Sequence, residues 1–250
     1  YIHGENLAQL AHVLISTERE TGGPYNTWIT DFKKDVRFDD CDIAVNANIA
    51  YMATLLGIHL PNLDSYFETS LISGVHSKYY QSSAVILYFI SRGYKGKNAH
   101  IFIEQIATLR KSIYGYSPQE DALLLSALHY FGVDISNEEK SIKNIIDASH
   151  LEATQLHWKK EIFYFERGDK EHMWYHMSDA LTTSICLEAL TLFYLSQTNK
   201  NANTSVTKNE VKETFQNEWN AITDMFISNT TDKEQATHWV DRISAHEWIK

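Results

Sequence analysis

Apolar residues recur at helical spacing along most of the chain. Near its start, Leu7, Leu10, Ala11, Leu14 and Ile15 follow the three- and four-residue intervals of one helix face. Further segments with this pattern are separated by turns that often contain glycine or proline, which end or begin helices. The sequence predicts helices over residues 5–17, 42–56, 62–72, 82–91, 99–113, 121–131, 138–153, 179–195, 208–227 and 233–249.

Three stretches interrupt this succession of helices. Residues 24–41 form a long loop that is rich in aromatic and charged side chains, and loops of that length are usually functional. Residues 158–165 alternate poorly, so we expect a loop or a short strand pair around Arg167-Gly168-Asp169. The polar residues 197–207 predict a flexible loop, and residues 208–250 then supply the C-terminal helices.

The expected helices alternate in character along the chain. An apolar stripe on one side is typical of an outer helix, whereas apolar residues all round indicate an inner one. We therefore predict an all-α protein, a single α/α toroid over residues 1–250, with an irregular helical bundle as the alternative. The more apolar helices begin near Asp42, Ser82, Asp121 and Asp179, and the more charged ones near Asn62, Ala99 and Glu138.

Composition narrows the classes of partner. With 44% apolar residues the chain can bury a sizeable core, and its net charge of −10 disfavours nucleic acid and anionic membranes as partners. No apolar run reaches the roughly 18 residues of a membrane span. Cys41 and Cys186 lie within apolar helical patterns, so we expect reduced thiols and a cytoplasmic protein.

An acidic cluster stands immediately before one expected inner helix. Asp39, Asp40 and Asp42 occupy four positions, and Ser178-Asp179 precede another such helix. In an α/α toroid the inner helices point the same way, so their N-termini gather at one mouth. A single capping Asp stabilises a helix start by about 1 kcal/mol, and three exceed that need. Repulsion between the three carboxylates would raise the pKa of one of them and so provide a general acid. Alternatively, the three carboxylates together would hold Mg²⁺.

Asn46 is expected to lie close to this cluster. It follows Asp42 by one helical turn, so both side chains lie on the same helix face. A buried asparagine must be hydrogen-bonded. The sequence leaves two interpretations open, in which Asn46 either orients Asp42 or binds the carbonyl of a neighbouring loop.

The segment Asp40-Cys41-Asp42-Ile43-Ala44-Val45 resembles the Asp-x-Asp-Asp-Thr-Ala segment of squalene-hopene and other class II terpene cyclases. The turn Gly22-Gly23-Pro24-Tyr25-Asn26-Thr27-Trp28 is similar to the Gly-Gly-aromatic-Trp turn of the protein prenyltransferase and squalene-cyclase repeats. The segment Ser178-Asp179-Ala180-Leu181-Thr182-Thr183-Ser184 echoes the first one, with Leu181 at the acid position. The resemblance covers about residues 5–195 and implies the toroid fold.

This resemblance also implies a chemistry. Asp42 would protonate an alkene of an isoprenoid or similar apolar chain, with Asp39 and Asp40 tuning it. Aromatic side chains would stabilise the carbocations by cation–π interaction. No metal is needed for that step, although Mg²⁺ would assist a diphosphate substrate. The expected substrate-binding residues are Trp28, Asn46, Tyr79, Tyr80, Trp174, Tyr175 and Asp179, and each aromatic is otherwise a packing residue.

Two alternatives belong to other classes. Ile43 replaces the last acid of the cyclase segment, which suits a toroid that serves as a non-catalytic binding or interaction module. A carbohydrate-active α/α barrel would need paired carboxylates about 5–10 Å apart on different helices. The acids here cluster on one segment, which disfavours that third class.

Overall fold

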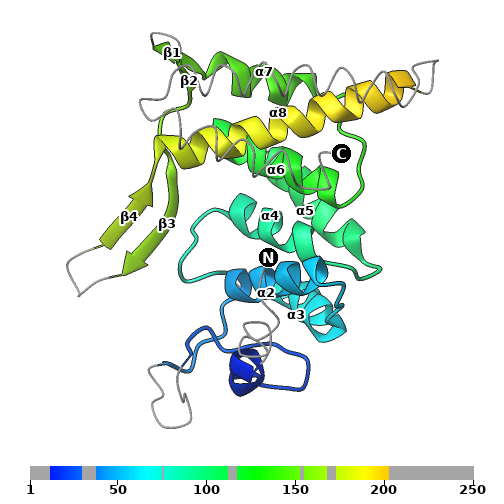
Figure 1. The fold of residues 1–250 in the computed structure, drawn as a ribbon, viewed down its shortest axis with the longest axis vertical. Coiled ribbons are helices and arrows are strands. Elements are labelled where there is room, and N and C mark those ends of the chain that lie inside the picture. Colours follow the sequence, from blue (N-terminus) through cyan, green and yellow to red (C-terminus); the bar gives the residue numbers. More distant parts are fainter. Residues whose placement is uncertain are drawn as a thin grey trace, which may run out of the picture. The chain divides into compact units, whose positions relative to one another are not determined.

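The structure is a computed structural model that describes residues 12–29, 38–74, 76–111, 117–152, 155–167 and 173–202 (Figure 1). The chain divides into two compact units, Tyr1–Ser196 and Gln197–Lys250, next to the start of the predicted polar loop. The predicted helices 208–227 and 233–249 lie outside the described residues, as does the first part of the helix expected over 5–17.

The described part of the chain is mostly helical, as predicted. Residues 12–17 are helical and lead into the loop before α2. None of the described helices is long and apolar enough to cross a membrane. The further helices are α2 (Ile43–Leu55), α3 (Pro61–Ile72), α4 (Ser83–Gly93), α5 (Ala99–Arg110), α6 (Pro118–Tyr130), α7 (Glu139–Asp147) and α8 (Asp179–Ala202).

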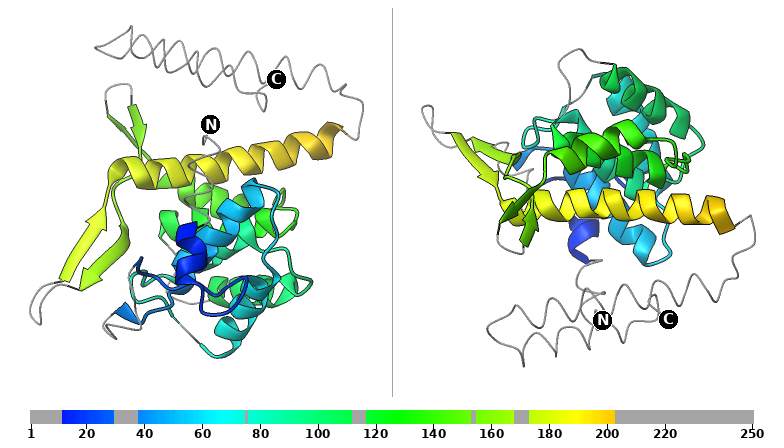
Figure 2. Two further views of the ribbon diagram at one scale, coloured as in Figure 1. Left: turned by 60° about the horizontal axis from the view of Figure 1, so that its bottom comes forward. Right: turned by 90° about the horizontal axis from the view of Figure 1, so that it is seen from above.

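Two small antiparallel hairpins accompany these helices. The strands β1 (His150–Glu152) and β2 (Gln155–His157) form one, and β3 (Ile162–Arg167) and β4 (Met173–Met177) form the other. The second hairpin is the strand pair expected around Arg167-Gly168-Asp169, and Figure 2 shows that it extends away from the helices.

Local residues explain where the helices begin and end. Asp42, Ser82 and Ser117 stand at N-cap positions, where each side chain accepts a hydrogen bond from an N–H of the first turn. Gly57 follows α2 with φ of 73°, a left-handed conformation that glycine adopts without steric cost. Pro61 begins α3, where its missing N–H would have no helical partner.

Six of the described helices pack in a regular arrangement. The helices α2, α4 and α6 pack in a row, and α3, α5 and α7 each contact the helix of this row that precedes them (Figure 1). In α6 the consecutive residues 122–128 are all buried, so every side of that helix is covered. In α5 only Phe102 and Ile106 are buried, as expected of a helix with one apolar stripe. A closed toroid stays a prediction.

Several predicted boundaries were wrong. The helix α6 begins at Pro118 and not at residue 121, because Ser117 caps it and proline suits the first turn. The helix α7 ends at Asp147 and not at residue 153, because the following residues pair as β1 and β2. Just after this hairpin, the buried indole N–H of Trp158 donates to the Ile145 carbonyl at 2.7 Å, which holds the hairpin against α7.

The helix α8 also differs from its prediction. It continues to Ala202, through the first residues of the expected polar loop. Only one stripe of it is buried, whereas an inner helix should be covered on all sides. Leu181 and Leu187, on its other side, are exposed. The buried stripe of α8 consists of Thr182, Ile185, Cys186 and Ala189.

Candidate functional site

The first turns of α2, α4 and α6 lie side by side, as the sequence predicted for inner helices. The Asp42 carboxylate accepts a hydrogen bond at 2.8 Å from the hydroxyl of Ser77, in the loop that leads into α4. The N-cap Ser82 donates to Glu120 in the first turn of α6 at 2.7 Å. These bonds join the starts of three helices at one end of the row.

The start of α8 joins the same end. The Thr182 hydroxyl donates to the side-chain oxygen of Gln119 in α6 at 2.9 Å, and both residues are buried. Asp179, predicted to bind substrate, is exposed and accepts the backbone N–H of Lys160 at 2.6 Å. Its carboxylate therefore fixes the segment before β3 to the start of α8.

Asp42 is the N-cap of α2 and is almost completely buried, with 3% of its surface exposed. One carboxylate oxygen accepts the N–H of Ala44 at 2.8 Å. The other accepts the Ser77 hydroxyl at 2.8 Å and the N–H of Lys78 at 3.1 Å. Both oxygens thus act as acceptors and tie α2 to the loop before α4. The predicted role of Asp42 as a general acid stays a prediction.

Asp40 lies in a different environment. One of its oxygens accepts the Lys78 ammonium at 2.5 Å, and the other accepts the Tyr79 hydroxyl at 3.0 Å. Burial by itself raises the pKa of Asp40, but these two hydrogen bonds and the charge of Lys78 outweigh it, so the pKa lies below its usual value. For Asp40 this direction is the opposite of the rise that the clustering of acids predicted.

Asp39 turns away from the other two acids. Its half-exposed carboxylate pairs with Arg19, which also donates to the side chain of Asn26 at 2.9 Å. Asp39 therefore has a partner of its own, whereas Asp40 and Asp42 share Lys78, through its ammonium and its backbone N–H respectively. Within the described residues no three His, Cys, Asp or Glu side chains come together as a metal site would require.

Asn46 binds the loop and not the carboxylate of Asp42. Its side-chain oxygen accepts the N–H of Tyr25 at 2.7 Å, and its amide group donates to the Tyr25 carbonyl at 2.9 Å. The amide group also donates to the backbone carbonyl of Asp42 at 2.9 Å. Of the two interpretations that the sequence left open, the loop contact is the observed one.

The nominated aromatic residues are only partly brought together. The Trp28 and Tyr79 rings meet edge to face with centroids 6.2 Å apart, and Tyr79 stacks on Tyr164 of β3 at 6.2 Å. Tyr80 meets Tyr164 at 5.5 Å, so this strand residue, which the sequence did not single out, joins the row. Trp174 on β4 is 62% exposed, and its neighbour Tyr175 is exposed as well.

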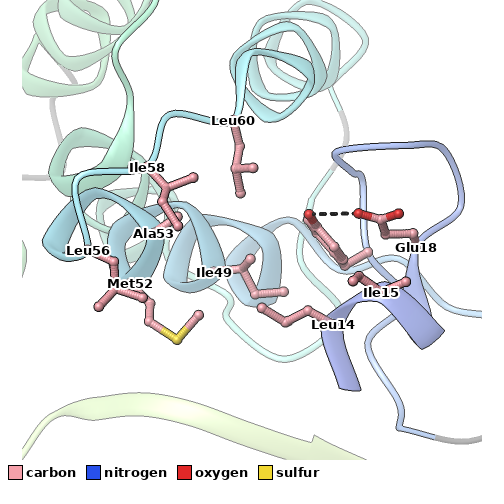
Figure 3. A pocket seen from close by; sticks show the side chains of 10 residues that line it. Leu14, Ile15, Glu18, Ile49, Met52, Ala53, Leu56, Ile58 and Leu60 are labelled. Carbon is pink, nitrogen blue, oxygen red and sulfur yellow. Dashed lines mark hydrogen bonds between the residues drawn. The ribbon is translucent and has the colours of Figure 1, made fainter. Parts of the chain in front are cut away.

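A pocket of about 170 Å³ lies between residues 14–25 and the region from α2 to the start of α3 (Figure 3). Its polar groups are the side chains of Glu18 and Tyr25. The Tyr25 hydroxyl donates a hydrogen bond to the Glu18 carboxylate at 3.2 Å. Burial, and then the charge of Glu18, raise the pKa of Tyr25 to about 12. The other lining residues are aliphatic: Leu14, Ile15, Ile49, Met52, Ala53, Leu56, Ile58 and Leu60.

None of the residues nominated from the sequence lines this pocket. Helical periodicity marks Ile49, Met52 and Leu56 only as one apolar face of α2. That face becomes a pocket wall because residues 14–25 cross it without filling the space, which no local pattern reveals.

A second constellation that the sequence did not indicate surrounds Arg92 at the end of α4. The guanidinium lies over the rings of Tyr51, Tyr88 and Phe89, at 4.5, 4.7 and 5.1 Å from their centroids. Asn48 of α2 accepts a hydrogen bond from it at 2.8 Å. The arginine is thus held between α2 and its own helix.

Two tyrosines extend this constellation to α6 and α8. The hydroxyls of Tyr88 and Tyr130 donate to the two carboxylate oxygens of Glu188, at 2.8 and 2.6 Å. Burial and then this carboxylate raise the pKa of both tyrosines above the usual value, so both remain hydrogen-bond donors. The residues come from four helices, and their separation in sequence explains why no spacing pattern pointed to them.

Comparison of the chain with protein-family models, curated proteins and solved structures found no match. The resemblance of the Asp40-Cys41-Asp42 segment to the terpene cyclases therefore stays a prediction.

Proposed function

We propose that the protein is a non-catalytic helical module that binds an apolar small molecule, an isoprenoid or a similar chain. The observation that carries this proposal is the pocket beside α2, which is walled by aliphatic side chains. Preformed, mostly apolar concavities with a few polar groups are the usual form of small-molecule sites. The engagement of Asp40 and Asp42 in hydrogen bonds within the fold supports binding over acid catalysis.

The size of the pocket restricts the ligand. Cavities of about 150 Å³ lined by aliphatic and aromatic side chains take up benzene. The 170 Å³ here therefore suits one branched five-carbon unit or a small ring, and the rest of a longer chain would lie outside. Burial contributes about 0.8 kcal/mol per CH₂ group. Affinity should therefore rise about fourfold with each carbon until the pocket is full.

The polar side of the pocket restricts the ligand further. The Glu18 carboxylate accepts the Tyr25 hydroxyl at 3.2 Å and the N–H of Gly22 at 3.2 Å. A negative charge at this place repels a phosphate or diphosphate head group, whereas it accepts a hydrogen bond from an alcohol. An uncharged isoprenoid alcohol therefore fits better than a prenyl diphosphate.

Calorimetry with prenol, geraniol and geranyl diphosphate tests the proposal. Ala53 is buried and lines the pocket, so Ala53→Phe should fill it and weaken binding of prenol and geraniol at least tenfold. Leu55 is on the same helix but is 68% exposed and does not line the pocket, so Leu55→Phe is the matched control. Equal binding by a folded Ala53→Phe variant would rule out this pocket as the site.

Acid-initiated cyclisation is the second candidate. The row of Trp28, Tyr79 and Tyr164 near Asp42 favours it, because ring faces stabilise carbocations. Asp42 would then have to give a proton to the substrate, although both of its oxygens accept hydrogen bonds in the fold. Incubation with squalene and prenyl diphosphates, followed by mass spectrometry, separates the two candidates. Cyclised products that disappear in Asp42→Asn would favour the enzyme, and none are expected from a binding module.

A further inference from the structure

Within the part of the chain that the structure describes, Arg92 has no carboxylate partner, unlike two other arginines. Arg19 pairs with Asp39 and Arg110 pairs with Glu138, whereas the single hydrogen bond of Arg92 to a described residue goes to the side chain of Asn48. Its Nε atom is buried without a hydrogen-bond partner, a state that only the Ser126 hydroxyl shares among the described residues. Buried polar groups are almost always hydrogen-bonded, so the exception calls for an explanation.

The guanidinium is nevertheless held in place. It lies over three rings, of which Tyr51 comes from α2 and Tyr88 and Phe89 come from its own helix α4. Stacking on aromatic faces keeps the charge and fixes the plane of the guanidinium. Nη2 donates to Asn48, and Nη1, which makes no hydrogen bond to a described residue, is not fully buried. Because the guanidinium group is already oriented, it loses little conformational freedom when a ligand binds to it.

The charges around Arg92 select a ligand class. Glu188 lies across Tyr88, which donates to it at 2.8 Å, so the constellation holds one positive and one negative group. A diphosphate would add several negative charges beside Glu188, whereas a carboxylate adds one. A carboxylate also matches the planar fork of a guanidinium. Tyr51, which is half-buried, and Tyr130, which is exposed, provide ring surface for an aromatic group.

We propose that Arg92 binds the carboxylate of a small aromatic acid, whose ring lies against Tyr51 and Tyr130. Tyr130 is 41% exposed, so this side of the constellation is open to a ligand. The site is separate from the pocket beside α2, since none of these residues lines that pocket. The proposal goes beyond the isoprenoid-binding function and does not depend on it.

Calorimetry or ligand-observed NMR with three matched probes tests the site. 3-Phenylpropionate should bind, and 3-phenylpropanamide, which lacks the charge, should bind at least tenfold more weakly. Phenyl phosphate should also bind more weakly than the carboxylate, because its second charge meets Glu188. Equal binding of acid and amide, or no binding of the acid at millimolar concentration, would overturn the proposal in the unaltered protein.

Variants locate the binding on Arg92 itself. Arg92→Lys keeps the charge and loses the planar fork, so the carboxylate should bind about tenfold more weakly. Lys143→Met removes a positive charge at an exposed position and is the control, for which no change is expected. Ala53→Phe should also leave carboxylate binding unchanged, which separates this proposal from the one about the apolar pocket. Full binding by a folded Arg92→Lys variant would contradict the proposal.

Discussion

Replacement of Asp42 by alanine should destabilise the protein far more than loss of a helix cap. The carboxylate accepts the N–H of Ala44, the hydroxyl of Ser77 and the N–H of Lys78, at 2.8, 2.8 and 3.1 Å. Only the first of these bonds belongs to the cap. The other two join α2 to the loop before α4, and Ser77 is itself buried.

The expected cost follows from these three bonds. Loss of an N-cap side chain costs about 1 kcal/mol. Each buried hydrogen bond to a charged acceptor contributes about 1.5 kcal/mol or more, and its loss leaves a donor without a partner. The sum for Asp42→Ala is about 4 kcal/mol, a large part of the roughly 5–15 kcal/mol that stabilises a typical domain.

Urea unfolding followed by circular dichroism measures this difference in the free energy of unfolding. The matched control is Asp39→Ala, three residues away, because this carboxylate is 48% exposed and pairs with Arg19 at the surface. Surface pairs contribute about 0–1 kcal/mol. A cost of about 1 kcal/mol for Asp42→Ala, equal to that of Asp39→Ala, would refute the reasoning that its carboxylate joins two segments.

Two further predictions concern pH and helix packing. The pKa of Asp40 lies below its usual value in the folded protein, so its stabilising effect is present above the unfolded-state pKa of about 3.9 and is lost as the pH falls through the lower folded value. Urea unfolding of Asp40→Asn between pH 7 and pH 3 should therefore show a deficit that narrows in acid, and a constant deficit would contradict the pairing with Lys78. A Cβ atom on Gly93 would lie 2.5 Å from the backbone nitrogen of Tyr51, so Gly93→Ala should cost about 3 kcal/mol by forcing α2 and α4 apart. Gly57→Ala meets no atom within 4 Å and should cost about 1 kcal/mol through its φ of 73° alone, so thermal unfolding that ranks the two equally would refute the close approach of the helices.

Local patterns in the sequence determined most of the helices and their alternation. The periodicity over α2 to α6 and the capping residue Ser82 act within a few residues of one another, so they are readable without a fold. Around residues 167–169 the sequence left a loop and a short strand pair open, and the pairing of β3 with β4 decided between them. The misplaced end of α7 reflects pairing of β1 with β2, which competes with a helical pattern that the sequence alone favours.

Tertiary structure decided what the functional side chains do. The sequence brought Asp39, Asp40 and Asp42 together, but their partners Arg19, Lys78 and Ser77 come from other segments. Those partners, and not the spacing of the acids, determine that the pKa of Asp40 is lowered and not raised. In this chain the acidic cluster marks the start of α2, whereas its spacing does not indicate the direction in which the pKa of Asp40 is shifted.

The two proposed binding sites show the same division. The bond between Tyr88 and Glu188 joins residues 100 positions apart, and the apolar pocket forms where residues 14–25 cross α2. Helical periodicity indicates which side of each helix is apolar. It does not indicate which helix faces pack against each other or where a gap remains between them. Packing alone turned the face of α2 into a pocket wall and left Arg92 without a carboxylate partner among the described residues.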